Sequence, residues 1–257
     1  MTIALVLLPW SAKSSDFSAS DYGIVHAWFS AGKGIELEDS KVIRWQSLQG
    51  SSELSPREGS SPPLFIAGEQ PAVQFEPENN LSGQLGEDVD IEKTFIFVGR
   101  LNSGTVGQLS VLRGLFMLWY QQGLAVKQNL DILQVVTRFP SDHRFEIMDE
   151  VQRAEALEPV MSIPADSAGM SIIVAVVMSL DRTAVYVNGQ ETLLLDYAVG
   201  FAMKNPPIAV GSYAVEDAAG ANALVNEAIL YATALEPKNR MALEDALSKR
   251  YGIALNR

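Results

Sequence analysis

Short apolar runs recur along the whole chain, and this repetition is the feature that most restricts its fold. The runs are rich in Val, Ile and aromatic side chains and are separated by clusters of Gly, Pro, Asn, Asp and Ser. Many short strands at such spacing are typical of an all-β sandwich or barrel, and helical periodicity is nearly absent. We predict strands at residues 23–29, 42–45, 72–75, 94–98, 115–120, 132–139, 145–148, 172–180, 184–187, 193–195, 208–210 and 223–231.

The segment TAVYVNGQETLLL, residues 183–195, predicts a tight antiparallel hairpin. Asn188-Gly189 lies between two apolar runs, and this pair readily adopts the positive φ angles of a type I′ turn. Alternation places Val185 and Val187 on one face of the first strand.

The run before this hairpin, SIIVAVVMSL, carries apolar side chains at successive positions. A strand with one solvated face would alternate apolar and polar residues, so we expect both faces of this strand to be covered. The sequence therefore places it in the core of a thick sandwich.

The end of the chain differs from the rest because it shows helical periodicity. Leu243, Leu247 and Tyr251 recur at i, i+4 and i+8. Pro237 suits the first position of a helix, and Gly252 suits the residue past its end. We expect one amphipathic helix to close the chain.

Composition excludes several classes of function. The 257 residues carry a formal net charge of −12, and no Lys/Arg block interrupts this acidity. Such a field repels phosphate backbones and anionic lipids, so we expect neither nucleic acid nor membrane as a partner. The absence of cysteine removes disulfides, thiolate metal sites and cysteine nucleophiles. His26 and His143 stand far apart and are interpreted as surface or hydrogen-bonded structural residues, because zinc normally takes three or more N or S ligands.

No fixed-period repeat and no sharp change in composition marks a second domain. We predict one domain at residues 21–257, preceded by an extension at residues 1–20. The apolar start of the extension, TIALVLLPW, would add a strand to its own sandwich or pair with a sheet edge on a neighbouring subunit. It lacks the basic segment of a secretory leader, so we expect no export signal. Residues 50–63, GSSELSPREGSSPP, are interpreted as a polar surface loop.

Six segments then carry a family resemblance: AWFSA (27–31), VIRWQSLQG (42–50), QPAVQF (70–75), KTFIFVGR (93–100), DRTAVYVNGQ (181–190) and VNEAILYATALEPKNRMALEDALSKRYGI (225–253). In this order they resemble the laminin-G-like, concanavalin A-like lectin and glucanase jelly-roll family. The resemblance is closest to its bacterial and phage branch, which ends in a helix with a KYG-like motif. It implies an all-β jelly roll of two antiparallel sheets packed face to face, with a C-terminal α-helix, in agreement with the strand pattern.

One loop departs from the family pattern. The segment after the second tryptophan usually reads WDDxSGNGxxA in this branch, whereas residues 45–50 read WQSLQG and lack the acidic side chains. A calcium ion inherited from the family would need several converging carboxylate or carbonyl oxygens. The sequence identifies no such site: we predict no cofactor and assign no metal ligand, and calcium binding stays an open alternative.

Some relatives with this sandwich are retaining β-glucanases, whose catalytic strand carries acidic residues at alternate positions. The nearest match is EIMDE, in which Glu146, Met148 and Glu150 would share one strand face. Met148 stands where the central Asp is expected, and a thioether cannot tune two carboxyl groups by hydrogen bonding. No GxSxG elbow, phosphate-binding glycine loop with Lys or HExxH motif is present. We therefore predict no catalytic residue and no enzyme activity.

Sugar recognition generally uses exposed aromatic faces and a few converging polar groups. Trp119, Tyr120 and Gln122, in the segment WYQQ, are the predicted glycan contacts, although alternation lets only one of the two aromatic rings point outward. Trp28 and Trp45 are the alternative platform, but in a sandwich of this size we expect such side chains mostly in the core or at an edge.

The sequence favours adhesion or assembly over catalysis. A solitary jelly roll without cysteines or an export signal fits a bacteriophage virion structural protein, a capsid decoration or tail-associated subunit assembled in the host cytoplasm. Its predicted partners are other virion proteins, further copies of itself in a homo-oligomer, and cell-surface glycans. The alternative is a secreted or surface carbohydrate-binding module located outside the cell, and a glycoside hydrolase is the third interpretation.

Overall fold

The computed structural model describes residues 17–76, 79–101, 117–118, 170–195, 202, 204–211 and 223–257. Neither helical segment in these residues has the length and apolar character needed to cross a membrane. The elements are the 3-10 helix η1 (Ala19–Asp21), the strands β1 (Val25–Ser30), β2 (Ile35–Glu38), β3 (Lys41–Gln46), β4 (Glu53–Pro56), β5 (Leu64–Ile66), β6 (Ala72–Phe75), β7 (Asn80–Gln84), β8 (Lys93–Leu101), β9 (Met117–Leu118), β10 (Ser171–Met178), β11 (Thr183–Val187), β12 (Gln190–Leu195), β13 (Pro207–Gly211) and β14 (Ala223–Tyr231), and the α-helix α2 (Pro237–Tyr251).

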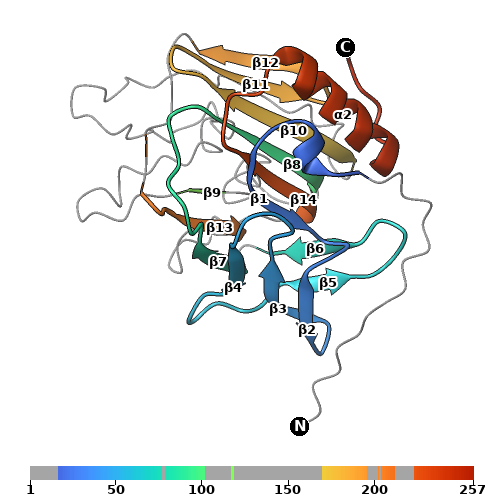
Figure 1. Ribbon diagram of the computed structural model, residues 1–257. Coiled ribbons are helices and arrows are strands. Elements are labelled where there is room, and N and C mark those ends of the chain that lie inside the picture. The colour runs from blue at the N-terminus through green and yellow to red at the C-terminus, as the bar shows by residue number, and fades with distance from the viewer. Residues whose placement is uncertain are drawn as a thin grey trace, which may run out of the picture.

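The strands form two layers that face each other (Figure 1). The larger layer runs β12-β11-β10-β8-β14 and continues through β6 and β5 to β3, with β1 beside β14 and β2 beside β3. The smaller layer runs β4-β7-β13-β9, and β4 joins the two because it pairs with both β3 and β7. Every strand pairing within the described residues is antiparallel. The predicted all-β, two-sheet sandwich with a C-terminal helix is therefore confirmed.

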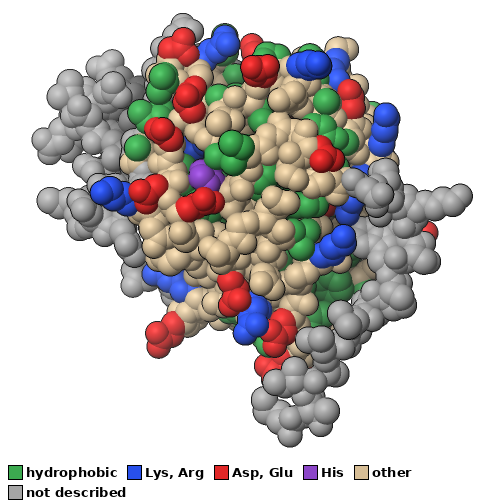
Figure 2. Space-filling view, viewed as in Figure 1, with side chains coloured by type: hydrophobic (Ala, Val, Ile, Leu, Met, Phe, Trp, Pro, Cys, Tyr) green, Lys and Arg blue, Asp and Glu red, His purple; other side chains and the backbone are tan. Residues whose placement is uncertain are grey.

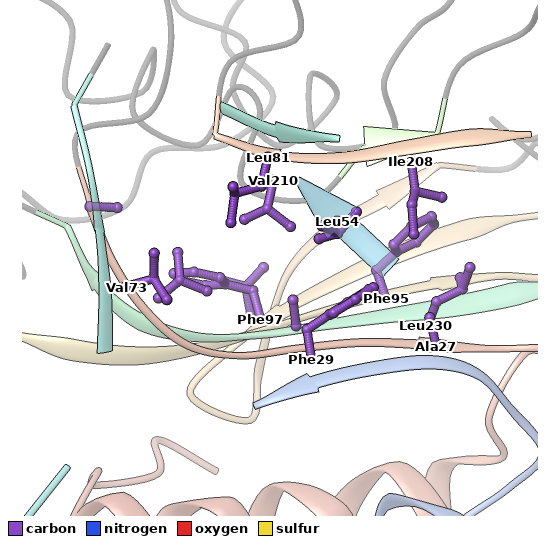
Figure 3. Packing of buried hydrophobic residues seen from close by; sticks show 14 of the residues in the cluster. Ala27, Phe29, Leu54, Val73, Leu81, Phe95, Phe97, Ile208, Val210 and Leu230 are labelled. Atoms are coloured by element: carbon purple, nitrogen blue, oxygen red, sulfur yellow. The ribbon is translucent and has the colours of Figure 1, made fainter. Parts of the chain in front are cut away.

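Apolar side chains fill the space between the layers (Figure 3). Leu81, Ile208 and Val210 point from the smaller layer towards the larger one, where Phe29 and Phe97 meet them. Each of these five side chains is at most 2% exposed. Burial of so many large apolar groups is the main driving force for joining the two sheets.

The other face of the larger sheet is covered by α2 (Figure 1). β10 is buried on one face by the inter-sheet core and on the other by the layer under α2. Val174 and Val176 point into the space between the sheets, whereas Ile173 and Ala175 lie on the helix side. All four side chains are at most 1% exposed, so the prediction that this strand is covered on both faces is confirmed.

α2 begins and ends at the predicted residues. Pro237 takes the first helical position, and Gly252 follows the helix with a left-handed φ of 64°. The periodic residues Leu243, Leu247 and Tyr251 are buried against the sheet. The predicted helix is therefore confirmed, and its apolar stripe explains why it packs on the larger sheet.

The predicted hairpin is formed by β11 and β12. Asn188 and Gly189 have φ angles of 49° and 83°, as a type I′ turn requires. The chain end returns to this turn, where the backbone N–H of Asn256 donates to Asn188 O at 2.7 Å. Arg257 then binds the helix, with its Nη1 2.9 Å from Asp245 Oδ1. The C-terminal residues therefore tie the helix to the hairpin.

A β-bulge in β14 decides which side chains of this strand face the helix. Its pairing with β8 shifts register between Val225 and Glu227. Without the bulge both residues would share one face, but only Val225 points between the sheets. After the bulge Ala228 and Leu230 take that side, and Ile229 lies under α2. The bulge thereby turns the carboxylate of Glu227 towards the helix.

Some sequence predictions need correction. Residues 50–63 contain the strand β4 in addition to loop, because Leu54 reaches the inter-sheet core and is fully buried. β2 and β7 were not predicted because their polar residues weaken the apolar signal, and β5 was not predicted because it is only three residues long. The strands predicted at residues 132–139 and 145–148 lie outside the described residues, as does most of 115–120.

Candidate functional site

The predicted glycan contacts Trp119, Tyr120 and Gln122 lie outside the described residues and stay predictions. The two alternative tryptophans are described. Trp45 is fully buried in the inter-sheet core, and Trp28 is 7% exposed. The interpretation of both as core residues is confirmed. His143 and the acidic segment Glu146, Met148 and Glu150 also lie outside the described residues.

A different group of aromatic and polar side chains gathers where η1 and β1 meet the loops at residues 47–52 and 85–92. The group has one half-buried aromatic pair, one amide and one imidazole–carboxylate pair. We name it the η1–β1 surface and define it by Phe17, Tyr22, His26, Gln49 and Glu87. Figure 2 shows the histidine at the surface with acidic side chains near it and a largely uncharged area beside them.

Phe17 and Tyr22 form the aromatic part of the surface. Their rings are stacked with centroids 6.0 Å apart and planes inclined by 29°. Phe17 also meets the edge of Trp28 at 5.5 Å, and the Arg250 guanidinium lies 5.5 Å from its ring centroid. Burial raises the pKa of the Tyr22 phenol, and the charges of Asp21 and then Asp245 raise it further. The phenol is therefore a neutral hydrogen-bonding group at ordinary pH.

Gln49 supplies the amide part of the surface. Its Nε2 donates to Ser20 Oγ at 3.5 Å, and Ser20 is within 2.8 Å of Ser18 Oγ. Gln49 belongs to the segment WQSLQG, whose loss of acidic side chains was noted in the sequence. The loop is fixed to β1 because the backbone N–H of Trp28 donates to Ser47 Oγ at 2.8 Å. The loop therefore brings an uncharged amide to Ser20 on η1.

His26 and Glu87 supply the imidazole–carboxylate part of the surface. His26 Nδ1 lies 2.7 Å from Glu87 Oε1, with the side chains 11% and 46% exposed. The prediction that His26 is a hydrogen-bonded structural residue is confirmed by this contact. Because Glu87 engages Nδ1, the ring nitrogen Nε2 remains as the imidazole's second hydrogen-bonding atom.

Two glycines allow the loops at residues 47–52 and 85–92 to approach β1 and each other closely. Gly50 has φ 74°, and a Cβ there would lie 2.2 Å from the carbonyl oxygen of His26. Gly86 has φ 85°, and a Cβ there would lie 2.6 Å from the Oγ of Ser51. Asn205 holds the second loop from the other side, since its Oδ1 accepts from the Gly86 N–H at 2.8 Å and its own N–H donates to Asp88 Oδ1 at 3.1 Å. The geometry of the polar groups is therefore set before any ligand arrives.

A buried polar network lies beneath the aromatic pair. The carboxylate of Glu227 is fully buried and accepts from Trp28 Nε1 at 2.8 Å and from Ser30 Oγ at 3.1 Å. The Tyr251 hydroxyl also donates to it, and Arg250 Nε lies 3.6 Å away. Burial raises the pKa of Glu227, whereas Arg250 and the three hydrogen bonds act in the opposite direction. Since Phe17 rests on Trp28, this network supports the η1–β1 surface from inside.

No cluster of three or more His, Asp or Glu side chains in the described part of the chain could hold a metal ion. The prediction of no cofactor stays a prediction, because the described residues are only part of the chain. Sequence reasoning missed Phe17, Tyr22, Gln49 and Glu87 as candidates. The nearest available signal was the serine- and aromatic-rich segment FSASDYG, which resembles an ordinary connection when read alone.

Comparison with known proteins adds a fold relationship. No protein-family model and no curated protein matches the chain. A solved structure that does match is domain 4 of an extracellular GH43 arabinanase from Geobacillus stearothermophilus, in complex with arabinotriose. Its TM-score is 0.51 and its identity 13%, over 86% of this chain and 98% of that one.

Two further matches come from larger proteins. The botulinum neurotoxin serotype G binding domain has a TM-score of 0.51 at 10% identity, over 87% of this chain and 51% of that one. Trypanosoma rangeli sialidase has a TM-score of 0.52 at 10% identity, over 90% of this chain and 33% of that one. The chain has the concanavalin A-like jelly-roll fold.

This concanavalin A-like jelly roll spans nearly all of the arabinanase domain, about half of the neurotoxin chain and a third of the sialidase. At 10–13% identity the likeness concerns the fold alone. The narrower resemblance to the bacterial and phage branch stays a prediction.

Proposed function

We propose that this chain is a non-enzymatic carbohydrate-binding module. The observation that carries the proposal is the match with the arabinanase domain, because that domain is covered along 98% of its length and was solved with an oligosaccharide. This supports the alternative drawn from the sequence, a secreted or surface carbohydrate-binding module. The η1–β1 surface adds the side-chain types that sugar binding uses: aromatic rings, an amide and a carboxylate.

Titration calorimetry with the purified protein tests the proposal. The ligand series contains arabinotriose and neutral oligosaccharides chosen from a glycan array. We expect saturable binding of at least one neutral glycan, and no release of reducing sugar during prolonged incubation. Absence of binding across the array would contradict the binding function, and steady hydrolysis of the bound glycan would contradict its non-enzymatic character.

The location of the module is a separate proposal. None of the matching proteins named above favours the predicted virion role, and carbohydrate binding does not decide it, since a virion subunit can also bind surface glycans. Mass spectrometry of purified particles addresses this point, together with the oligomeric mass of the isolated protein. Absence of the chain from particles that contain the other structural proteins would remove the virion interpretation.

A further inference from the structure

We propose that the η1–β1 surface is the saccharide-binding site and that it selects neutral sugars over anionic ones. This inference rests on the proposed carbohydrate binding and goes beyond it by naming the residues and the class of sugar. The argument has three steps: the chemistry of the side chains, their rigidity and their charge.

The chemistry of the surface suits a pyranose or furanose ring. A sugar presents an apolar C–H face and an edge of hydroxyl groups, which need an aromatic ring and planar hydrogen-bonding groups respectively. Phe17 and Tyr22 offer stacked rings that are half-buried. Gln49 offers an amide from the adjacent loop, and Glu87 offers a carboxylate that is 46% exposed.

Gln49 and Glu87 are near neighbours through one glycine. A Cβ placed on Gly50, the residue after Gln49, would lie 3.9 Å from Glu87 Oε1. Gly50 also abuts the backbone of His26, so the amide loop and the imidazole–carboxylate pair meet at this residue. The loop at Gln49 and Gly50 therefore connects the two parts of the surface: Gln49 donates to Ser20 on η1, and Gly50 abuts His26 and Glu87.

The site is rigid before binding. Ser52 Oγ donates to Leu85 O at 2.7 Å and links the two loops, while Asn205 fixes the second loop at Gly86. A preformed site loses less conformational entropy when a ligand binds. This favours measurable affinity from a small number of contacts.

Charge decides the class of sugar. Glu87 is exposed at the site, Asp21 lies close enough to Tyr22 to raise the pKa of its phenol, and Asp88 follows Glu87 in the same loop. The Arg250 guanidinium, which lies 5.5 Å from the Phe17 ring centroid, is 14% exposed and faces the buried Glu227 at 3.6 Å. A sialic or uronic acid carboxylate would thus approach like charges, within a chain whose net charge is −12.

The test compares variants of the full chain by titration calorimetry with arabinotriose, lactose and sialyllactose. Glu87→Gln and Gln49→Ala change the proposed polar contacts. Glu53→Gln is the matched control, because Glu53 is 48% exposed and ion-pairs with Arg44 on β3, at 3.3 Å. Thermal unfolding of each variant checks that the fold is retained.

We expect Glu87→Gln to weaken binding of a neutral sugar about tenfold or more, since hydrogen bonds to charged groups are the stronger contacts. Gln49→Ala removes a neutral amide and should weaken binding by roughly two- to tenfold. Glu53→Gln should stay within about twofold of the wild type. Sialyllactose should bind more weakly than lactose, with a gap that narrows as salt screens the carboxylates.

Three results would overturn parts of the proposal in distinguishable ways. If the wild type binds none of the sugars, carbohydrate binding itself is wrong and the site falls with it. If the wild type binds and both site variants bind equally well, the function stands and the site is wrong. If sialyllactose binds as tightly as lactose, the selection for neutral sugars is wrong.

Discussion

The two faces of the larger sheet are buried in different ways. Towards the smaller sheet the buried side chains are mostly apolar, with Phe29, Phe95 and Phe97 among the largest, although the fully buried Lys93 shares the face of Phe95 on β8. Towards α2 the buried layer contains charged side chains among its apolar ones, including Glu227 and Glu244, both fully buried. The same strands thus separate a mostly apolar interior from one with internal ion pairs.

The helix layer holds a second charged group besides the Glu227 network. Arg240 Nη1 donates to both carboxylate oxygens of Glu244, at 2.6 and 2.7 Å. Its guanidinium lies 3.5 Å from the ring centroid of Tyr186 on β11, and Arg257 Nη2 donates to Glu244 at 3.0 Å. The helix is therefore tied to the hairpin and to the chain end at one point.

This contrast suggests a division of roles between the two faces. Apolar burial between the sheets is non-directional and tolerates changes that conserve volume. Hydrogen-bonded charges are directional, and breaking a buried pair leaves an uncompensated group. We infer that the inter-sheet core provides most of the stability, and that the polar contacts fix where α2 sits on the sheet.

The largest effect is expected from a cavity between the sheets. Phe97→Ala should lower the free energy of unfolding by about 3–5 kcal/mol, since it removes a buried aromatic ring from the inter-sheet core. Urea denaturation measures this. Ile24→Ala, at a residue 71% exposed, should change stability by no more than about 0.5 kcal/mol. Equal effects of the two substitutions would show that the core does not dominate.

A smaller loss is expected in the helix layer. Tyr251→Phe removes the hydroxyl that donates to Glu227 and should cost about 1–3 kcal/mol. Hydrogen exchange should show that the substitution increases the exchange rate more in α2 than in β10. The helix loses its hydrogen bond to Glu227, whereas the inter-sheet core is unchanged. Tyr22→Phe, in a tyrosine stacked on Phe17, is the control and should leave exchange in α2 unaltered. Uniform acceleration across both elements would contradict the separation of the two layers.

The smallest effect expected is a dependence on pH that arises in the helix layer. Since burial raises the pKa of Glu227 above 4.5, the protonated form favours the fold. The stability gained is fully present below about pH 4.5 and is lost as the pH rises through the higher folded-state pKa. The free energy of unfolding of the wild type, relative to Glu227→Gln, should therefore fall as the pH rises. A relative stability that increases with pH would mean that the donors around Glu227 outweigh its burial.

The apolar patterns predicted the sheets well. The strand predicted at residues 72–75 matches β6, and that at 223–231 matches β14. The helix was predicted from Leu243, Leu247 and Tyr251, because these apolar residues repeat at helical spacing. β6 and the helix could be predicted because a single local period determines which side chains are buried, and β14 because apolar residues lie on both sides of Asn226 and Glu227.

The buried charged residues could not be predicted from a local sequence pattern. Trp28 and Glu227 are 199 positions apart, and the bulge that aims the carboxylate at α2 gives no local period. The η1–β1 surface was missed for the same reason, since Gln49, His26 and Glu87 come from three separate segments of the chain. Sequence reasoning reached the loop at residues 45–50 only as a departure from the family pattern.

The contact between the chain end and the hairpin turn offers a graded way to loosen the molecule. Truncation before Arg257 would remove the bonds to Asp245, Glu244 and Met241 O, and truncation before Asn256 would also remove the bond to Asn188. Both truncations leave α2 complete, so they reduce, step by step, the number of contacts that hold the helix on the hairpin. An affinity tag placed after Arg257 would start beside this junction, whereas a tag at the other terminus would leave it intact.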